Sequence, residues 1–140
     1  MSAPDRFKAF RIHDDEDGFR SAVEDVGLGD LSEGEVTIRV PYRDEFIRPG
    51  GTISGPVMMA VADFAMYGVV LSLIGRVDLA VTTNLSINFL RRPPPGDVVA
   101  RARILKLGRR LAVGEVHLHE GEAEHLVAHV TGTYSIPPRP

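Results

Sequence analysis

The sequence predicts an α+β domain in which an antiparallel β-sheet wraps around one long central helix. Two observations favour this class. Residues 56–74 form the only long apolar stretch of the chain, and four segments rich in β-branched residues follow it, with short turns between them. A run of strands after a single apolar helix is typical of a sheet that packs on that helix. We therefore expect the 140 residues to form a single domain, 1–140.

The N-terminal part of the chain is expected to contribute a short helix and one strand. Residues 1–15 are polar and mixed in charge, which indicates a loose arm. Residues 17–26 carry apolar side chains at helical spacing, so they predict a short amphipathic helix that ends at Gly27 and Gly29. Residues 35–42 alternate between apolar and polar and are expected to form a half-buried strand.

The central helix is expected after a loop over residues 43–52. Pro56 suits the first turn of a helix, so residues 56–74 are predicted to be helical. This stretch is long enough to span a bilayer. Asp63 at its centre, together with Gly68 and the strands that follow, argues against a membrane span and favours a buried helix.

The C-terminal half is expected to form the antiparallel strands. Three successive prolines, residues 93–95, must interrupt any strand ladder. Turns with Gly108 and Gly121 separate the later segments. The four predicted strands cover residues 79–90, 98–107, 111–119 and 124–136.

Composition excludes several classes of function. The formal net charge of −3 gives no general attraction to nucleic acid or to an anionic membrane. The absence of cysteine excludes disulfides, thiolate metal sites and cysteine nucleophiles. The N-terminus lacks the apolar core of a signal peptide, so a cytoplasmic location is expected.

Asp63 is the most informative residue, because a carboxylate inside a buried helix requires a partner or a chemical role. We favour a catalytic role over a carboxylate tied only to a neighbouring hydroxyl. Gly55 precedes Asp63 by eight positions, or roughly 12 Å along a helix. One small reacting group could not touch both residues within one chain, whereas two chains packed antiparallel could bring one Gly55 beside the other Asp63.

Short motifs between residues 35 and 136 occur in a telling order: Gly50-Gly51-Thr52-Ile53-Ser54-Gly55, Ala62-Asp63, Asn88-Phe89-Leu90-Arg91-Arg92-Pro93, Gly96-Asp97 and Leu107-Gly108-Arg109. Together they resemble the hotdog-fold thioesterases of the PaaI-like (phenylacetate-type) branch, which hydrolyse acyl-coenzyme A. The resemblance implies a homo-oligomer, a dimer or a dimer of dimers, that acts on an acyl-CoA or aryl-CoA substrate. No cofactor is expected apart from the coenzyme A of the substrate.

The resemblance also implies roles for individual residues. The Gly55 backbone N–H would polarise the thioester carbonyl, and Asp63 would act as general base or nucleophile. Thr82 lies near the position of a water-orienting hydroxyl, with Thr83 as the next candidate. A helix N-terminus suits this chemistry on physical grounds, because its unpaired N–H groups and positive dipole end stabilise developing negative charge. Since Pro56 has no N–H, the available donors are Gly55 and the residues from Val57 onward.

Two positions depart from the pattern of many relatives. Ser54 stands where they carry a histidine, and Arg48 stands where they carry an asparagine. Ser54 could cap the helix, and Arg48 could bind a carboxylate or phosphate.

Two arginine pairs are candidate anchors for the phosphates of coenzyme A, because guanidinium groups suit phosphate recognition. The pairs are Arg91 with Arg92 and Arg109 with Arg110. Solvated turn arginines are the alternative interpretation.

Three histidines form a conceivable metal patch, since His117 and His119 alternate onto one strand face and His129 lies on the next strand. Without a carboxylate at a fixed spacing, we expect no metal site and interpret them as solvent-facing or interface residues.

A thioesterase is therefore the predicted function. A non-catalytic acyl-CoA-binding sensor or scaffold of the same fold is the alternative from another class. A hotdog dehydratase would require a catalytic histidine near the helix, and there is none between His13 and His117.

Overall fold

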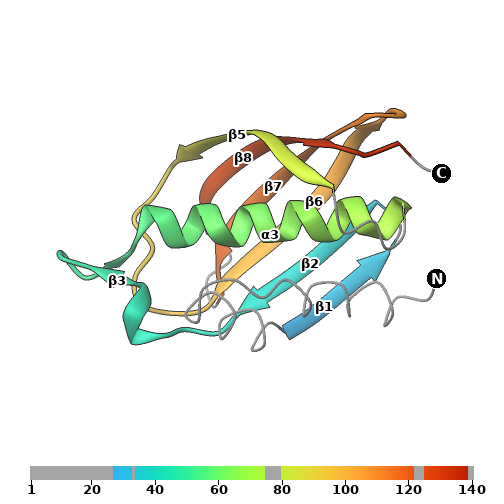
Figure 1. Cartoon of the computed structure of the whole chain (residues 1–140). Helices are drawn as coiled ribbons and strands as arrows, with labels where there is room; N and C mark the ends of the chain where they lie inside the picture. Colours follow the sequence, from blue (N-terminus) through green and yellow to red (C-terminus); the bar gives the residue numbers. More distant parts are fainter. Residues whose placement is uncertain (1–26, 33, 75–79, 122–124, 139–140) are drawn as a thin grey trace.

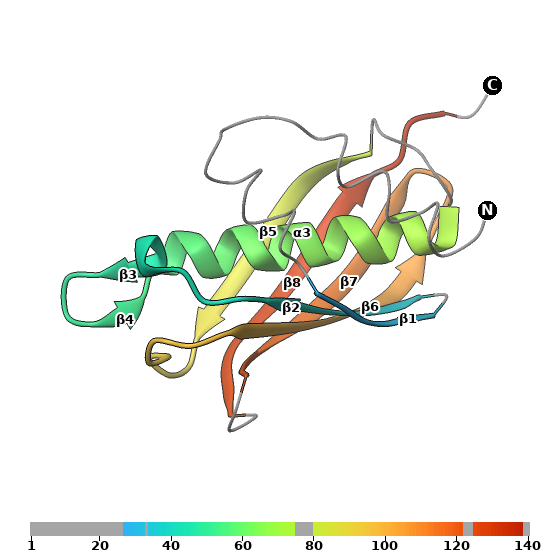
Figure 2. The same cartoon turned by 90° about the horizontal axis from the view of Figure 1, so that it is seen from below.

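A computed structural model describes residues 27–32, 34–74, 80–121 and 125–138. The expected N-terminal arm and the helix over residues 17–26 lie outside the described residues, as does most of the turn after the central helix. In the described part, one sheet wraps around a single long helix, α3 (Gly55–Ile74), as Figures 1 and 2 show. This arrangement confirms the predicted α+β class.

The main sheet is antiparallel, and its strand order is β1-β2-β6-β7-β8-β5. The five expected strands are all present, with ends that shift by one or two residues. The six strands are β1 (Gly27–Ser32), β2 (Glu35–Val40), β5 (Val81–Phe89), β6 (Val98–Leu107), β7 (Leu111–Glu120) and β8 (Leu126–Ser135).

Two segments differ from the sequence prediction. Gly27 and Gly29 were expected to end a helix, but they belong to strand β1, which pairs with β2 at the edge of the sheet. Backbone hydrogen bonds to β2 hold this edge strand, so the pattern of apolar residues in this segment does not predict it. The expected loop over residues 43–52 contains a 3-10 helix (Asp44–Phe46) and a small hairpin of β3 (Ile47–Arg48) and β4 (Thr52–Ile53).

The hairpin turns at Gly50 and Gly51, whose φ angles of 107° and 80° lie in the left-handed region that favours glycine. The hairpin projects beyond the start of α3 (Figure 2).

The core lies between α3 and the concave face of the sheet. Alanine and glycine at the contacts bring the helix close to the strands: Ala62 and Ala65 are fully buried, and Gly114 and Gly132 face each other on β7 and β8. A Cβ atom built on Gly114 would lie 2.9 Å from Met66 Sδ. Among the described residues, no helix has the length and hydropathy needed to cross a membrane.

Candidate active site

Asp63 is held by two side-chain hydroxyl groups from the sheet. Thr82 Oγ1 donates a hydrogen bond of 2.6 Å to Asp63 Oδ1, and the Tyr134 hydroxyl donates one of 2.7 Å to the same oxygen. Asp63 itself is half-buried in the middle of α3. The carboxylate thus has partners that satisfy one of its two oxygens and fix its orientation.

A β-bulge aims Thr82 at the helix. Thr82 pairs with Tyr134 in the β5–β8 register, and the register then shifts before Asn84. Bulges of this kind insert one extra residue and redirect neighbouring side chains. The inserted residue is Thr83, whose hydroxyl donates to the Thr133 carbonyl at 3.2 Å. The structure therefore brings Thr82 to Asp63 and directs Thr83 to the backbone of β8.

Tyr134 is the site residue that the sequence analysis missed. It is buried, and its hydroxyl also lies 3.0 Å from the Asp63 backbone carbonyl. Burial raises the pKa of the Tyr134 hydroxyl well above its ordinary value, and the neighbouring Asp63 charge raises it further. The hydroxyl therefore stays protonated and keeps donating. One signal was available: Tyr134 is a polar aromatic residue at an inward position of an otherwise apolar strand face.

The hydroxyl groups of Thr82 and Tyr134 bind only one of the two oxygens of the Asp63 carboxylate. Both bonds end on Oδ1, and in the described residues no hydrogen bond reaches Asp63 Oδ2. A carboxylate fixed through one oxygen can present the second to a water molecule or a carbonyl carbon. This geometry is compatible with both roles predicted for Asp63, general base and nucleophile.

The start of α3 carries the second part of the site. Ser54 caps the helix, because its Oγ accepts a hydrogen bond of 3.3 Å from the Val57 N–H, as expected for a serine at this position. The Met58 N–H donates to the Ser54 carbonyl. The Val57 and Met58 N–H groups are thus used within the helix start, and Pro56 has no N–H. Of the expected donors, the Gly55 N–H therefore stays the leading candidate for a ligand.

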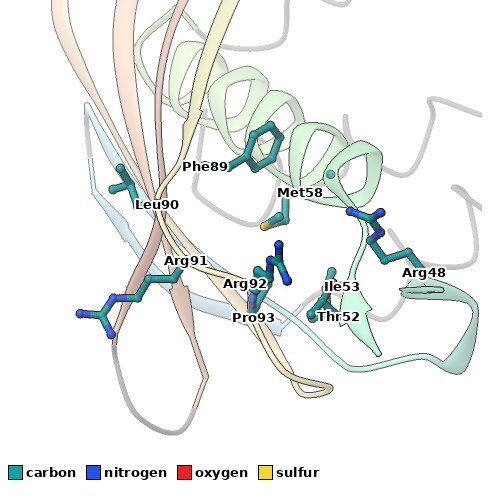
Figure 3. A pocket seen from close by; sticks show the side chains of 10 residues that line it. Arg48, Thr52, Ile53, Met58, Phe89, Leu90, Arg91, Arg92 and Pro93 are labelled. Carbon is teal, nitrogen blue, oxygen red and sulfur yellow. The ribbon is translucent and has the colours of Figure 1, made fainter. Parts of the chain in front are cut away.

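A pocket of about 520 Å³ opens at this helix start (Figure 3). Gly55 and Met58 line it from α3, and Phe89 lines it from the end of β5. The Phe89 ring lies against Gly55, where an added Cβ atom would meet Phe89 Cζ at 3.3 Å. Any larger residue at position 55 would therefore displace the ring and narrow the pocket.

The arginines divide between this pocket and the far end of the sheet. Arg48, Arg91 and Arg92 line the pocket, and Figure 3 shows the Arg91 side chain pointing away from the helix, whereas Arg48 and Arg92 extend toward its start. Arg110 lies near the start of β5, at the end opposite the pocket. Its carbonyl accepts a hydrogen bond from the Ile136 N–H, and the residue before Ile136, Ser135, pairs with Val81 at the start of β5. One chain does not bring the two arginine pairs together.

The three histidines do have a carboxylate neighbour, contrary to the expectation from the sequence. A metal site was not expected because no carboxylate stood at a fixed spacing from them. The structure places Glu115 beside two of the three histidines, with its Oε2 at 3.1 Å from His129 Nε2 and its Oε1 at 3.5 Å from His117 Nε2. This cluster is on the outer face of the sheet, away from Asp63.

Several known proteins are similar to this chain. A family model described as the thioesterase superfamily matches residues 50–126, more than half of the chain. A protein of Thermoplasma acidophilum, named as a candidate esterase, is 31% identical over 120 residues that cover 86% of this chain and 89% of the relative.

Two solved structures are also similar to this chain. A candidate thioesterase from Silicibacter sp. TM1040 is 43% identical with a TM-score of 0.75, and the match covers 94% of this chain and 97% of that one. A mutant of the phenylacetic acid degradation protein PaaI from Thermus thermophilus is 27% identical with a TM-score of 0.71, over 80% and 93% of the two chains.

Proposed function

The chain belongs to the thioesterase superfamily as a hotdog-fold thioester hydrolase of the PaaI-like branch, and we propose that it hydrolyses an acyl- or aryl-CoA thioester with Asp63 as its catalytic carboxylate. The observation that carries the proposal is the pair of hydroxyl donors on Asp63 Oδ1, because it orients Oδ2 as a base. The Gly55 pocket would receive the thioester itself.

The two parts of the site belong to different subunits in this proposal. The pocket beside Gly55 is not lined by Asp63, which lies eight residues and roughly 12 Å further along α3. A single thioester carbonyl cannot contact both residues of one chain. We therefore propose that a second subunit supplies the carboxylate.

Strand β5 offers the surface for that second subunit. It lies at one edge of the described sheet, and its Val81 and Phe89 are 55% and 49% exposed. A nine-residue edge strand with exposed apolar side chains is a template for pairing with another chain. A twofold pairing of β5 with its copy would continue the sheet across a homodimer.

Antiparallel pairing would also place the two parts of the site together. The start of β5 holds Thr82 against Asp63, and the end of β5 holds Phe89 against Gly55. In an antiparallel pair, the end of one strand lies beside the start of the other. Gly55 of one subunit would thus face Asp63 of the partner subunit, the arrangement expected from the spacing of the two residues.

The reaction follows from these positions. The Gly55 N–H donates to the thioester oxygen and stabilises the negative charge that develops there. Asp63 Oδ2 of the partner subunit takes a proton from water, and the water oxygen forms a bond to the carbonyl carbon. The carbon–sulfur bond then breaks, and the proton passes to the leaving thiolate. The products are a carboxylic acid and free coenzyme A.

Coenzyme A would lie along the pocket with its phosphates near arginine. Arg48 and Arg92 are placed for this role on the same subunit as Gly55 (Figure 3). Arg109 and Arg110 remain candidates from the partner subunit, because antiparallel pairing moves the partner's far sheet end toward this pocket.

The test is a panel of short, long and aromatic acyl-CoA esters, with release of free thiol followed by a thiol-reactive dye. Hydrolysis of at least one ester, with a kcat/KM above about 10⁴ M⁻¹s⁻¹, is the expected result. Saturable binding of the esters without thiol release would overturn the proposal and favour the acyl-CoA-binding sensor.

A further inference from the structure

The outer face of the sheet carries a side-chain cluster formed by Glu115, His117 and His129. Val116 and Leu118 of β7 are fully buried toward α3, so the alternating residues Glu115 and His117 project from the opposite face. His129 lies directly across from His117 in the β7–β8 register. The helix covers the other face of these strands (Figures 1 and 2). The cluster is therefore separated from Asp63 by the sheet itself.

The side chains of this cluster lie close enough together to share one metal ion. One ligand atom from each residue lies within 4.8 Å of the others. Glu115 Oε2 is 3.1 Å from His129 Nε2, and Glu115 Oε1 is 3.5 Å from His117 Nε2. A tetrahedral ion with bonds of about 2.0–2.1 Å requires its ligand atoms to be roughly 3.3–3.4 Å apart. Side-chain rotations that bring one Glu115 oxygen and both nitrogens to this spacing would complete three corners of a tetrahedron.

The backbone holds the ligands in place before any ion binds. Glu115 and His117 are two residues apart on one strand, and His129 is fixed on the neighbouring strand by ladder hydrogen bonds. The rings of His117 and His129 are edge to face, with centroids 5.0 Å apart. A site on adjacent strands loses little entropy on binding, because the main chain need not move.

The donor set selects the class of ion. Two imidazole nitrogens and one carboxylate oxygen suit borderline transition-metal ions such as Zn²⁺, whereas Mg²⁺ and Ca²⁺ prefer an all-oxygen shell. The two imidazoles are partly accessible, since the side chains of His117 and His129 are 43% and 33% exposed. A hollow of about 380 Å³ adjoins Glu115 and His117.

Arg103 competes with a metal ion for Glu115. Its Nε lies 2.8 Å from Glu115 Oε1, and its side chain is exposed, so the guanidinium can turn into solvent. A metal ion at Glu115 must therefore displace this guanidinium contact.

From this geometry we propose that Glu115, His117 and His129 bind one Zn²⁺ ion per chain, at a site separate from the thioester pocket. The ion would take the place of the direct contacts between Glu115 and the two imidazoles.

Isothermal titration calorimetry of the full chain with Zn²⁺ tests the proposal, and the protein must carry no histidine tag. We expect a stoichiometry of one ion per chain and a dissociation constant on the order of 1–10 µM, weaker than that of four-ligand structural sites. His117→Ala and His129→Ala should each weaken binding by at least about tenfold.

A matched control comes from the same sheet. His125 is paired with Glu120 at 3.3 Å and is not in the three-ligand group, so His125→Ala should leave Zn²⁺ affinity unchanged. Asp63→Asn should also bind Zn²⁺ normally, which separates this site from the proposed catalytic one. Circular dichroism of each variant checks that the sheet is retained.

Arg103 provides the sharpest comparison. Arg103→Gln removes the competing cation and keeps a long polar side chain, so it should tighten Zn²⁺ binding by about threefold or more, the reverse of the histidine variants. The proposal is overturned if wild-type protein binds no Zn²⁺ below about 100 µM. It is equally overturned if affinity survives the double change His117→Ala with His129→Ala.

Discussion

The Tyr134 hydroxyl lies 2.7 Å from Asp63 Oδ1, although the two residues are 71 positions apart in the sequence. One comes from the middle of the central helix and the other from the last strand of the sheet. Their contact shows that the lone carboxylate of α3 is held by the sheet. The orientation of Asp63 therefore depends on how the helix and the sheet pack together.

Asp63→Asn should keep the fold and lower kcat by more than about tenfold, because the amide matches the carboxylate in shape but has no basicity. Steady-state kinetics on the best CoA ester measures the effect, and thermal unfolding checks the fold. A smaller decrease corresponds to less than roughly 1.4 kcal/mol of transition-state stabilisation. Asp63 would then be a structural carboxylate held by Thr82 and Tyr134.

Tyr134→Phe should lower kcat by about three- to tenfold, because it removes one of the two hydroxyl groups that donate to Asp63 Oδ1 and orient the carboxylate. Steady-state kinetics on the best CoA ester measures the effect. Tyr42→Phe, in the loop after β2, is the matched control and should leave kcat unchanged. An unchanged kcat in Tyr134→Phe would assign the tyrosine to packing alone.

Arg92→Ala should raise KM for a CoA thioester more than Arg91→Ala does, because only the Arg92 side chain of this pair extends toward the helix start in Figure 3. The ratio of KM values for a CoA ester and for the matching pantetheine ester isolates the phosphate contribution. Loss of one charge-assisted contact should change this ratio by about tenfold. If the KM ratio is the same in wild type, in both single variants and in the double variant, Arg91 and Arg92 do not bind the phosphates. Arg109 and Arg110 would then be the next candidates.

Mixing two inactive variants should restore activity if the site is shared. Asp63→Asn lacks the base, and Gly55→Trp displaces Phe89 and blocks the pocket. After unfolding and refolding together at equal concentration, half of the dimers should be heterodimers with one intact site of two. Recovered activity should then approach about a quarter of wild type. Proven subunit exchange without recovery would place both residues in a site made by one chain.

Gly114→Ala should destabilise the fold, because the new Cβ atom would lie 2.7 Å from the Arg103 carbonyl and 2.9 Å from Met66 Sδ. Overpacking of this kind costs about 1–3 kcal/mol in the free energy of unfolding. Gly96→Ala is the control, since its Cβ would approach only the Pro94 carbonyl, at 4.0 Å. Urea unfolding of both variants measures the difference, and equal midpoints would show that Met66 and the backbone at Arg103 adjust without cost.

The sequence alone determined the architecture and several local features of this protein. The apolar stretch, the three prolines and the alternating strands predicted the helix and five of the six strands of the main sheet. These signals are local, since they depend on periodicity and on backbone restrictions within a few residues. The Ser54 cap is a local feature of the same kind.

Only the tertiary structure decided which residues meet. Thr82 and Thr83 are neighbours in sequence, and the bulge in β5 sends one to Asp63 and the other to the backbone of β8. Tyr134 and Glu115 acquire their partners through the register between distant strands. A shift of one residue in register turns every side chain of a strand to the opposite face. Such contacts depend on how strands pair across the sheet, and no pattern within a single segment contains that information.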